Sequence, residues 1–593
     1  MKPEYKAKYD VVVLGFGGAG ATAARFAADN GAKVLLVDSA PYGHEGGNTR
    51  YCIQLIGTGD NYEKLLAYYK KLSAPMDEDE KVQEVYAKGM TNMREYLEKY
   101  LNVNPVSVRH DNLDTSKYAF PLQEMLEEFP EYEGANTFDF SLVHEGIADS
   151  ALWKILRQKV IDRSTNIDVW LNSRAKHLII DPDDKTVVGA IIERNGKNIR
   201  VAATKGVVLT LGGYENSREM AQTYLNSKYL APFGTLYNKG DGIRLSIEAG
   251  AQLWHMWNYE SAGVLPGLAF YTEEGKRARL VFDNSQFKNG SIIAVTEDGT
   301  RYMNESGANR HGHVYNHGRW DIPRYHTNIH LVFDQKQLKK IKSKPDPFEG
   351  FDKTLVKAAT VEELAEKINV PVANLKQSIS DFNFFVDQEK DYQFNRDVKT
   401  MSKFDDGPFY AIKMVNSVLN TQGGPKRNSK AQIVDQTDQP IKHLYGAGEL
   451  GGVCVNNYQT ACNIAECLIF GKIAGENVTK EESKKVAAST EMNGQNDLIN
   501  HEDKITLDSN QYLGVSHSGM GDEIKVRVTY QDSRITNVEI VSENESEDVG
   551  KRALKVVPQE IVNANSIDVD AVTGATRTSK AIEEAVENAL KNK

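Results

Sequence analysis

The feature that most constrains this chain is a glycine-rich turn between a strand and a helix near the N-terminus. The run YDVVVLG is almost continuous in β-branched and aliphatic residues, which is typical of a parallel strand buried on both faces. Gly15, Gly17 and Gly20 follow it in a G-x-G-x-x-G pattern and open an alanine-rich segment, and AKVLLVDS then reads as the next strand. Residues 8–38 therefore predict a β-α-β unit of the Rossmann type.

Each residue type in this turn has a physical reason to be there. The first glycine permits a tight turn, the second lets the backbone approach a pyrophosphate, and the third lets the helix lie close to the strand. The helix N-terminus offers unpaired N–H groups to phosphate, and Asp38 ends the second strand where a carboxylate holds ribose hydroxyls. The motif alone does not separate FAD from NAD, and a glycine-rich turn without a ligand remains the alternative.

The bulk composition narrows the class of protein. The chain has 593 residues, more than one hydrophobic core usually supports, so two or three domains are expected. Its formal net charge of -11 disfavours nucleic acid and anionic membranes as partners. Its apolar runs are too short to predict a membrane helix, and no signal-peptide pattern is visible at the N-terminus. Four cysteines without a CxxC pair lead us to expect a reducing, cytoplasmic location.

The order of segments predicts an interrupted first domain and a small final one. After the α/β rhythm ends, a stretch rich in Tyr, Trp, His and Arg reads as an inserted cap, and strand-like text resumes at AQIVD and HLYGAGELGG. A polar stretch follows, and EIKVRVTYQ and RITNVEIVSE then alternate as a hairpin before two helical segments. The expected parts are 1–250 (first domain), 251–419 (α+β cap), 420–482 (completion of the first domain), 483–504 (linker) and 505–593 (α+β domain).

Further glycine-rich segments extend the pattern of the first domain. They are Gly46-Gly47-Asn48-Thr49, GVVLTLGG at 206–213, NKGDG at 238–242 and LYGAGELGG at 444–452. Each alone is an ordinary turn, but in this order they resemble the superfamily of FAD-dependent fumarate reductases, urocanate reductases and 3-ketosteroid dehydrogenases, over roughly residues 8–480. The resemblance implies an FAD site made of Gly15, Gly17, Gly20, Asp38, Gly47, Asn48, Thr49, Ala175, Gly212, Asp241, Glu449, Asn463 and Ile464.

Two of these positions carry specific roles in the family. Glu449 is expected to hold the ribityl chain of FAD. Asn463 and Ile464 open the predicted helix NIAECLIFGKIAGE, whose N-terminus points at the pyrimidine edge of the flavin in the family. A helix N-terminus stabilises the negative charge that reduced flavin carries there.

A second flavin is indicated near the C-terminus. The run from Asp570 to Thr578, DAVTGATRT, resembles the D-x-x-[ST]-G-A-[ST]-x-[ST] signature of FMN-binding domains in respiratory flavoproteins. In that family a flavin transferase joins FMN to the last hydroxyl through a phosphoester. By position this residue is Thr578, with Ser579 as the alternative if the register differs by one. The other interpretation is a helix capped by threonine without a flavin.

One loop of the expected cap resembles the family segment that precedes a catalytic arginine. Residues 299–313, GTRYMNESGANRHGH, match G-x-R-F-x-N-E, and in fumarate reductases the arginine after it protonates the substrate. Counting from Glu305 places the family position on Asn309, so Arg310, one residue later, is the candidate proton donor. Because arginine is a poor acid, an anion clamp or a structural arginine remains open.

The expected carboxylate-binding residues of fumarate and urocanate reductases are missing. An H-T-x-G-G segment is replaced by Asn420-Thr421-Gln422-Gly423-Gly424, and the closing loop reads Asn456-Asn457-Tyr458-Gln459 with no arginine. Fumarate is therefore disfavoured, and Tyr458 is the candidate to polarise a carbonyl, with simple packing over the flavin as its alternative. We expect an activated alkene such as an enone, an aryl acrylate or a steroid-like ring.

Several remaining polar residues have no fixed assignment. His311, His313, His317, His326 and His330 fall in the expected cap, but no cysteine or carboxylate pattern completes a metal site, so none is predicted. His255, Trp257, Tyr259 and Glu260 line a pocket or pack at a hinge, and the sequence leaves both open.

Three functions stay open on the sequence. The first is a reductase in which electrons pass from FMN to FAD to a C=C bond, including a urocanate or fumarate type with altered ligands. The second is a ketosteroid-type dehydrogenase, and the third is an electron-carrying subunit without an active substrate site. Because no second dinucleotide turn is present, the expected donor is another protein or a free reduced flavin.

Overall fold

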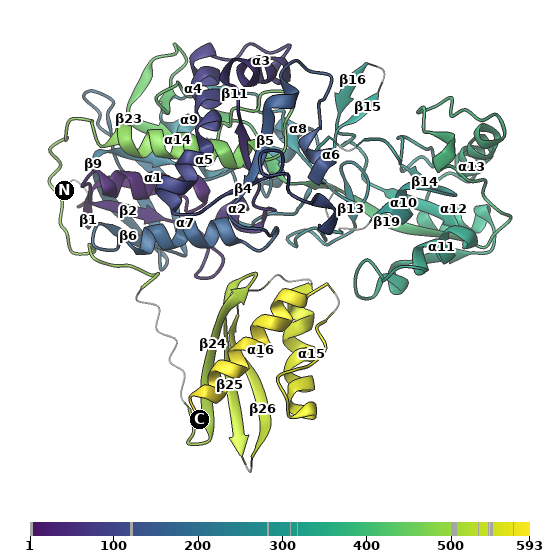
Figure 1. The fold of residues 1–593 in the computed structure, drawn as a ribbon. Helices are drawn as coiled ribbons and strands as arrows, with labels where there is room; N and C mark the ends of the chain where they lie inside the picture. Colours follow the sequence, from purple (N-terminus) through teal and green to yellow (C-terminus); the bar gives the residue numbers. More distant parts are fainter. Residues whose placement is uncertain are drawn as a thin grey trace.

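The computed structural model describes residues 4–118, 122–281, 284–308, 310–316, 318–499, 507–531, 533–543, 545, 549–572 and 574–593. It consists of a large α/β body, a lobe with its own sheet, and a small C-terminal domain (Figure 1).

The body is built on an eight-stranded sheet whose main path runs β22-β23-β9-β1-β2-β6. Strand β1 (Ala7–Leu14) pairs in parallel with β2 (Val34–Val37) and β9 (Lys197–Leu209), and β23 (Pro440–Gly446) extends the sheet beyond β9. The predicted Rossmann-like fold, completed from far along the chain, is therefore confirmed. The other strands of this sheet are β6 (Ile167–Trp170), β7 (Ser173–Ile180), β8 (Val187–Arg194) and β22 (Gln432–Val434).

Two glycine-bearing helices lie against each other on this sheet. Helix α1 (Gly18–Asp29) packs on α14 (Cys462–Val478), and a Cβ atom at Gly471 or Gly475 would meet the backbone of α1. Alanines on α1 and glycines on α14 thus allow a close approach that larger side chains would prevent. This contact joins the two sequence-distant halves of the body. Its remaining helices are α2 (Gly47–Tyr51), α3 (Tyr62–Ser73), α4 (Glu80–Thr91), α5 (Met93–Tyr96), α6 (Leu122–Leu126), α7 (Ala151–Ile161), α8 (Arg218–Leu225) and α9 (Asp241–Glu248).

The segment 50–165 differs from the sequence expectation. It is helical in large part, as predicted, but it also forms a three-stranded sheet in the order β3-β5-β4, from Ile56–Gly59, Phe138–Leu142 and Val106–Ser107. Strand β3 reads IGTG, and its partner β5 lies about eighty residues further along the chain. A strand so short and rich in glycine carries little local signal, so only its long-range pairing defines it.

The second lobe, which we call the cap lobe, has a six-stranded sheet. Alternate residues of β14 (Ile292–Val295) and β17 (Ile329–Asp334) enter separate hydrophobic clusters, with Ile292 and Leu331 in one and Ile293 and Val332 in the other. Both faces of the sheet are therefore covered, as Figure 1 shows at its right-hand side. The lobe also contains β10 (Ala231–Pro232), β13 (Leu268–Phe270), β15 (Val314–Asn316), β16 (Arg319–Asp321), β18 (Val356–Ala358), β19 (Phe409–Val418), α10 (Ser285–Lys288), α11 (Gln335–Lys342), α12 (Val361–Ile368) and α13 (Val372–Asp387).

The two chain crossings between body and cap lobe lie side by side. Outgoing strands β11 (Leu253–Trp254) and β12 (Tyr259–Glu260) pair with returning strands β21 (Gly424–Pro425) and β20 (Asn420–Thr421). Two short antiparallel ladders therefore connect the lobes.

The C-terminal domain is a three-stranded antiparallel sheet, β24 (Gln511–Gly519), β25 (Asp522–Gln531) and β26 (Arg534–Glu543), with helices α15 (Val549–Ala564) and α16 (Thr576–Lys591). The predicted hairpin and helices are present, and β24 adds a strand that the sequence reading did not include. Within the described residues, no helix combines the length and apolar character needed to cross a membrane.

Candidate functional site

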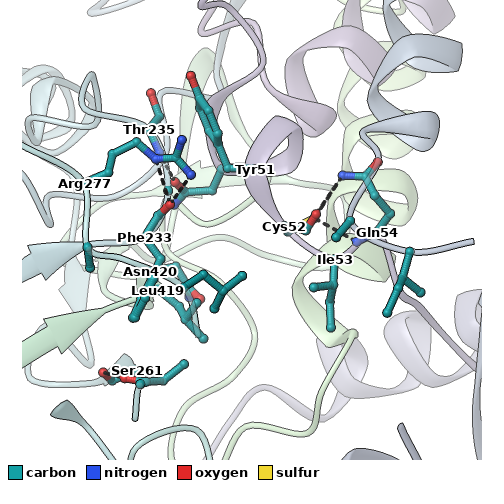
Figure 2. Close-up of a pocket in the computed structure, with 18 of the residues that line it drawn as sticks. Tyr51, Cys52, Ile53, Gln54, Phe233, Thr235, Ser261, Arg277, Leu419 and Asn420 are labelled. Atoms are coloured by element: carbon teal, nitrogen blue, oxygen red, sulfur yellow. Dashed lines mark hydrogen bonds between the residues drawn. The ribbon is translucent and has the colours of Figure 1, made fainter. Parts of the chain in front are cut away.

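A large cavity lies between the body, the cap lobe and the C-terminal domain. Its volume is about 2430 Å³, well beyond the ~300–1,000 Å³ of an ordinary ligand pocket. Figure 2 shows one wall, where the Arg277 guanidinium donates to Phe233 O from Nε (3.0 Å) and Nη2 (2.8 Å) and lies 4.0 Å from the Tyr51 ring centre. The cavity is large enough for more than one bound group.

The predicted glycine turn forms one end of this cavity. Gly15 has a φ of +103°, and a Cβ atom at Gly20 would collide with Gly15 O, so both positions require glycine. The Asp38 carboxylate accepts from Phe16 N at 2.7 Å, and burial raises its pKa to about 6. Gly15, Gly17 and Asp38 line the cavity, whereas Gly20 supports the turn from behind.

Helix α1 begins at this turn with a glycine as its N-cap residue. This N-cap is Gly17, and Thr49 Oγ1 accepts from Gly18 N at 3.1 Å. A buried helix start with a glycine N-cap and an adjacent glycine backbone is a suitable cradle for phosphate. Thr49 and Gly47 line the same end of the cavity, so the predicted pyrophosphate site fits a dinucleotide.

A buried carboxyl pair lies next to the turn. Asn48 Nδ2 donates to Glu215 Oε1 and to Glu449 Oε2, each at 2.8 Å, and Thr421 N donates to Glu449 Oε1 at 3.0 Å. Burial, with the charge of Glu215 adding to it, holds the pKa of Glu449 well above its usual value, and burial likewise raises the pKa of Glu215. The pair therefore keeps a proton, and Glu449, the member that lines the cavity, can meet a ribityl chain as a hydrogen-bond donor or acceptor. Glu215 was missed from sequence, and only its place after the Gly212-Gly213 turn offered a signal.

The flavin-facing helix is present as predicted. Helix α14 starts after Ala461, which has a φ of +76°, and no side chain caps it. Asn463 and Ile464 line the cavity at this N-terminus. The open N–H groups suit the anionic edge of a reduced flavin.

Three other predicted FAD residues have mixed positions. Gly212 and Asp241 line the cavity, but the Asp241 carboxylate is bound by Arg174 Nη2 at 2.6 Å and Arg244 Nη1 at 2.9 Å. Ala175 lies in β7 within a hydrophobic cluster and is not among the cavity-lining residues. Its contact with FAD stays a prediction.

Tyr458 lines one corner of the cavity, in the loop just before the N-terminus of α14. The His311 ring stands edge-on to it, with ring centres 4.5 Å apart. His311 Nδ1 is 2.6 Å from Glu128 Oε1, and all three residues line the cavity. Burial holds the pKa of Tyr458 well above its usual value, so its hydroxyl stays protonated and can donate. The sequence named His311 only as one of several histidines and did not identify Glu128, because only the tertiary fold brings them together.

Glu260 is buried behind this corner. It is fully buried, and neither of its carboxyl oxygens has a hydrogen-bond partner within the described residues. His313 Nδ1 lies 3.8 Å from Glu260 Oε2, and burial lowers the pKa of His313 to about 4. Burial holds the pKa of Glu260 well above its usual value, so both groups are uncharged at neutral pH.

Arg310 occupies a different place from the one expected of a proton donor. Its guanidinium binds Glu131 through Nη1 (2.6 Å) and Nη2 (3.1 Å) and lies over the rings of Phe129 and Trp320. Arg310 is not among the cavity-lining residues. These contacts favour the structural alternative, and the proton-donor role stays a prediction that no step below uses. Asn309, His317 and Thr573 lie outside the described residues.

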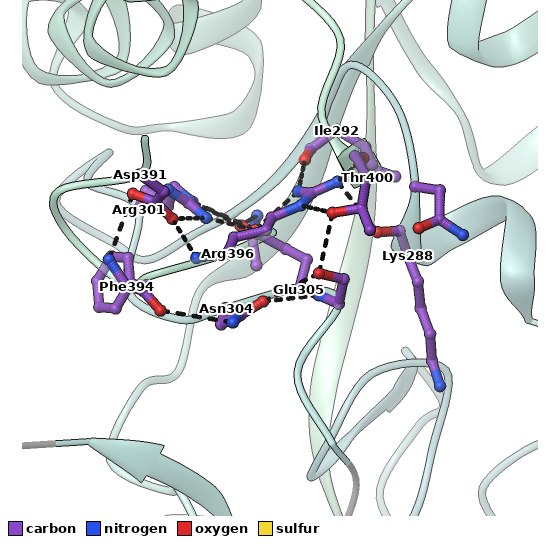
Figure 3. Close-up of polar contacts among 12 residues, drawn as sticks. Lys288, Ile292, Arg301, Asn304, Glu305, Asp391, Phe394, Arg396 and Thr400 are labelled. Atoms are coloured by element: carbon purple, nitrogen blue, oxygen red, sulfur yellow. Dashed lines mark hydrogen bonds and ion pairs between the residues drawn. The ribbon is translucent and has the colours of Figure 1, made fainter. Parts of the chain in front are cut away.

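The loop before Arg310 is anchored by a buried ionic network (Figure 3). The Glu305 carboxylate accepts from Arg301 Nη2 and Arg396 Nη1, each at 2.9 Å, and Arg301 also binds Asp391 at 2.9 Å. Arg396 Nη2 donates to Lys288 O at 3.0 Å, while the Lys288 side chain points away from the network and lines the cavity. The R-Y-M-N-E motif is therefore structural here. Within the described residues, no His, Cys or carboxylate cluster suits a metal ion.

Thr578 lies on the C-terminal domain where this domain meets the cavity. Its Oγ1 donates to Glu545 Oε2 at 2.6 Å, and it lines the cavity near the uncapped start of α16. Ser579, the alternative, uses its hydroxyl to bond Ala575 O (3.0 Å) and Val572 N (3.0 Å). The geometry favours Thr578 as the residue that faces a bound flavin phosphate.

The C-terminal domain contacts the body through α2 and α7 (Figure 1). Arg50 Nη2 donates to Gly521 O at 2.7 Å, and Lys154 Nζ donates to Gly519 O at 2.6 Å. Arg577 Nη1 lies 3.0 Å from Asp149 Oδ2. These polar contacts place the Thr578 region at the mouth of the cavity that holds the FAD-binding residues.

Known proteins share this arrangement. The chain is 27% identical over 482 residues to a probable fumarate reductase, Ifc3, of Shewanella frigidimarina, which covers 80% of this chain and 75% of that protein. It is 25% identical over 491 residues to the vinyl phenol reductase of Lactiplantibacillus plantarum, with 74% and 89% covered. The open conformation of a flavocytochrome c3 fumarate reductase superimposes with a TM-score of 0.58 at 26% identity, covering 80% of this chain and 78% of that one.

The family models agree with the two halves of the site. Residues 10–464 match the FAD binding domain, and residues 519–591 match the FMN-binding domain. The first match covers most of the chain, from before the glycine turn to the start of α14 at Asn463 and Ile464. The chain therefore belongs to the FAD-binding-domain family and is an FAD-dependent oxidoreductase with a C-terminal FMN-binding domain.

Proposed function

We propose that this protein reduces an activated C=C bond, in an enone, an aryl acrylate or a steroid-like substrate, with electrons passing from FMN to FAD to the substrate. The observation that carries the proposal is the shared cavity, which residues of the dinucleotide turn and the Thr578 region line together. FMN and FAD bound in one cavity could pass electrons directly to each other within one molecule. When bound, FAD would supply the hydride and FMN the electrons that restore reduced FAD, and a proton from solvent would complete the reduction.

Thr578 is the proposed attachment point of FMN. We propose that a flavin transferase moves the FMN group of a flavin diphosphate such as FAD onto Thr578 Oγ1, which loses its proton as the nucleoside monophosphate leaves. This hydroxyl is hydrogen-bonded to Glu545. The uncapped start of α16 offers N–H groups to the phosphate. An external protein or a free reduced flavin supplies the electrons to this domain.

Tyr458 and helix α14 provide the electrostatics of the reaction. The protonated Tyr458 hydroxyl hydrogen-bonds a substrate carbonyl and stabilises the negative charge that develops on its oxygen. The N-terminus of α14, at Asn463 and Ile464, stabilises the anionic edge of the flavin ring. The relatives named for reduction of fumarate and vinyl phenol support a reductive direction.

An anaerobic assay with reduced viologen tests the proposal. The protein is offered fumarate, urocanate, cinnamates and 3-oxo-Δ4 steroids, and we expect viologen oxidation with an enone or aryl acrylate and little with fumarate. In parallel, oxidised protein is mixed with saturated ketones. Flavin bleaching by a saturated ketone, with no alkene reduced, would indicate the dehydrogenase instead, and no response in either direction would indicate an electron-carrying subunit.

A further inference from the structure

The corner of the cavity formed by Tyr458, His311 and Glu128 has the chemistry of a recognition site. We propose that this corner binds an uncharged oxygen of the substrate, as in a phenol or a ketone, and excludes a carboxylate, so that an aryl acrylate places its carboxylate outside this corner. The inference rests on the proposed function for the reaction, but it concerns only which functional group the corner accepts.

The carboxylate of Glu128 is already fully engaged by protein donors. Its Oε2 accepts from Thr460 N (2.7 Å), Thr460 Oγ1 (2.8 Å) and Gln459 Nε2 (3.3 Å), and its Oε1 is 2.6 Å from His311 Nδ1. Glu128 is 6% exposed, so this arrangement is a built feature of the interior. A buried carboxylate with four donors fixes the groups around it.

Glu128 determines which nitrogen of His311 is offered to the cavity. Because a carboxylate only accepts hydrogen bonds, Nδ1 of His311 carries a proton. Nε2 makes no hydrogen bond to the described residues, and the ring lines the cavity beside Tyr458. With the proton on Nδ1, Nε2 of His311 is the ring nitrogen left to meet a substrate hydroxyl, and the Tyr458 hydroxyl donates to a substrate oxygen.

Among the residues that the structure describes, this corner offers a substrate carboxylate no unpaired cation. His311 is already paired with Glu128, and the guanidinium of Arg310 is bound to Glu131 away from the cavity. The acidic side chain of Glu260 lies directly behind, fully buried. A third acidic group here would lose its hydration and face the charge of Glu128, which disfavours the ionised form.

The corner is assembled from both lobes. Glu128 and Tyr458 belong to the body, whereas His311 lies in the loop between β14 and β15 of the cap lobe. The carbonyl of His311 accepts from Ser261 N at 2.9 Å. His311 also adopts a left-handed φ of +48°, a conformation held by these contacts. The recognition site is therefore complete only when the two lobes are together.

Equilibrium binding to the oxidised, FAD-loaded protein tests this inference without turnover. Three ligands of one shape are titrated by flavin difference absorbance and calorimetry: 4-ethylphenol, 4-ethylcyclohexanone and 4-ethylbenzoate. We expect the phenol and the ketone to bind at least about tenfold more tightly than the benzoate, since the benzoate lacks a charge-assisted partner. In Glu128→Gln this preference should fall by about tenfold.

A matched variant controls for a general change in charge. Glu127→Gln removes the adjacent acidic side chain, which pairs with Arg109, is 46% exposed and is not among the cavity-lining residues, so it should leave the preference unchanged. His311→Gln provides a second variant in case Glu128→Gln does not retain FAD, and it should weaken phenol binding most. An unchanged preference in both Glu128→Gln and His311→Gln would overturn the inference. Because this test measures binding and not turnover, its result does not depend on the outcome of the viologen assay.

Discussion

At the scale of single residues, the most consequential feature is the pair of buried carboxyl groups that Asn48 bridges. Glu215 and Glu449 both carry raised pKa values in the folded protein, because each is buried and they face one another. Two such groups cannot both ionise cheaply at short range. The protonation of this pair therefore makes the stability of the FAD-binding region depend on pH.

This coupling predicts how the FAD-free protein responds to pH. Above about pH 4.3, a carboxyl group in the unfolded chain has released its proton, whereas one with a raised pKa in the folded protein still holds it. The free energy of unfolding therefore falls as pH rises from the unfolded pKa to the folded pKa. Thermal unfolding of FAD-free protein from about pH 5 to about pH 8 should show this fall. In Glu449→Gln the fall should be clearly shallower, whereas Glu84→Gln, at an exposed position of α4, should follow the wild type. Equal slopes in all three proteins would contradict the assignment.

Tyr458 allows a second test at this scale. Tyr458→Phe keeps the ring beside His311 but removes the proposed donor to the substrate carbonyl. We expect kcat with a substrate from the viologen panel to fall by about 10²-fold, the usual cost of one lost oxyanion donor, with FAD content unchanged. Tyr392→Phe, at a side chain that is 59% exposed, should keep full activity. A fully active Tyr458→Phe protein would support simple packing instead.

What could be predicted residue by residue depends on how local the signal is. Gly15, Gly17 and Asp38 were predictable because a turn between strand and helix requires them within a short stretch of chain. Glu128 and Glu215 were not, because their roles arise from partners far away in sequence. Arg310 was predicted as a proton donor from its spacing in the family-like segment. That spacing could not show that its guanidinium pairs with Glu131, which is distant in sequence.

At the scale of elements, the cap lobe depends on one buried ionic network. Glu305 lies between Arg301 and Arg396, and all three are almost fully buried. The charges of the two arginines stabilise the ionised form of Glu305, and they lower its pKa despite its burial. The network fixes the loop that leads to His311.

Removing the central charge should destabilise the lobe. Glu305→Gln leaves two buried guanidinium groups with less compensation, which typically costs about 3–5 kcal/mol. We expect a lower thermal unfolding temperature and faster proteolysis within the cap lobe. Asp405→Asn, which removes an exposed partner of Lys336, should cost at most about 1 kcal/mol. If both variants unfold alike, the network does not have the proposed importance.

The elements themselves were predictable where pattern and length were strong. The strands of the main sheet and α14 carry long apolar or alternating runs, and the structure has them. Strands β3 and β4 are only four and two residues long and pair with distant β5, so no local pattern specified them. Strand β24, by contrast, is nine residues long and pairs with neighbouring β25, but its sequence QYLGVSHSG, with two glycines and two serines, carries only a weak strand pattern.

At the scale of the whole molecule, polar contacts hold the C-terminal domain to the body. The Arg577–Asp149 pair and the bonds from Arg50 and Lys154 join the two. Polar contacts between domains permit relative motion. Such a contact set suits a domain that docks over the FAD site and also meets an external donor.

This docking should depend on ionic strength. In wild-type protein, small-angle scattering should give a larger radius of gyration at high salt, because salt screens the ion pair between the domains. Asp149→Asn removes one charge of that pair, so it should be expanded already at low salt and respond less to added salt. Lys6→Gln, at an exposed position with ion pairs to Glu4 and Glu491, should behave as wild type. A radius that is the same under all conditions would indicate a permanently fixed domain.

The central claim is that both flavins serve one cavity within one molecule, and anaerobic stopped-flow tests it most directly. Fully reduced protein is mixed with an alkene that the viologen assay has identified, and flavin absorbance is followed at several protein concentrations. The account predicts two phases of reoxidation, both independent of protein concentration, and a single phase in Thr578→Val. A second phase that accelerates with protein concentration, or a wild-type trace identical to that of Thr578→Val, would contradict it.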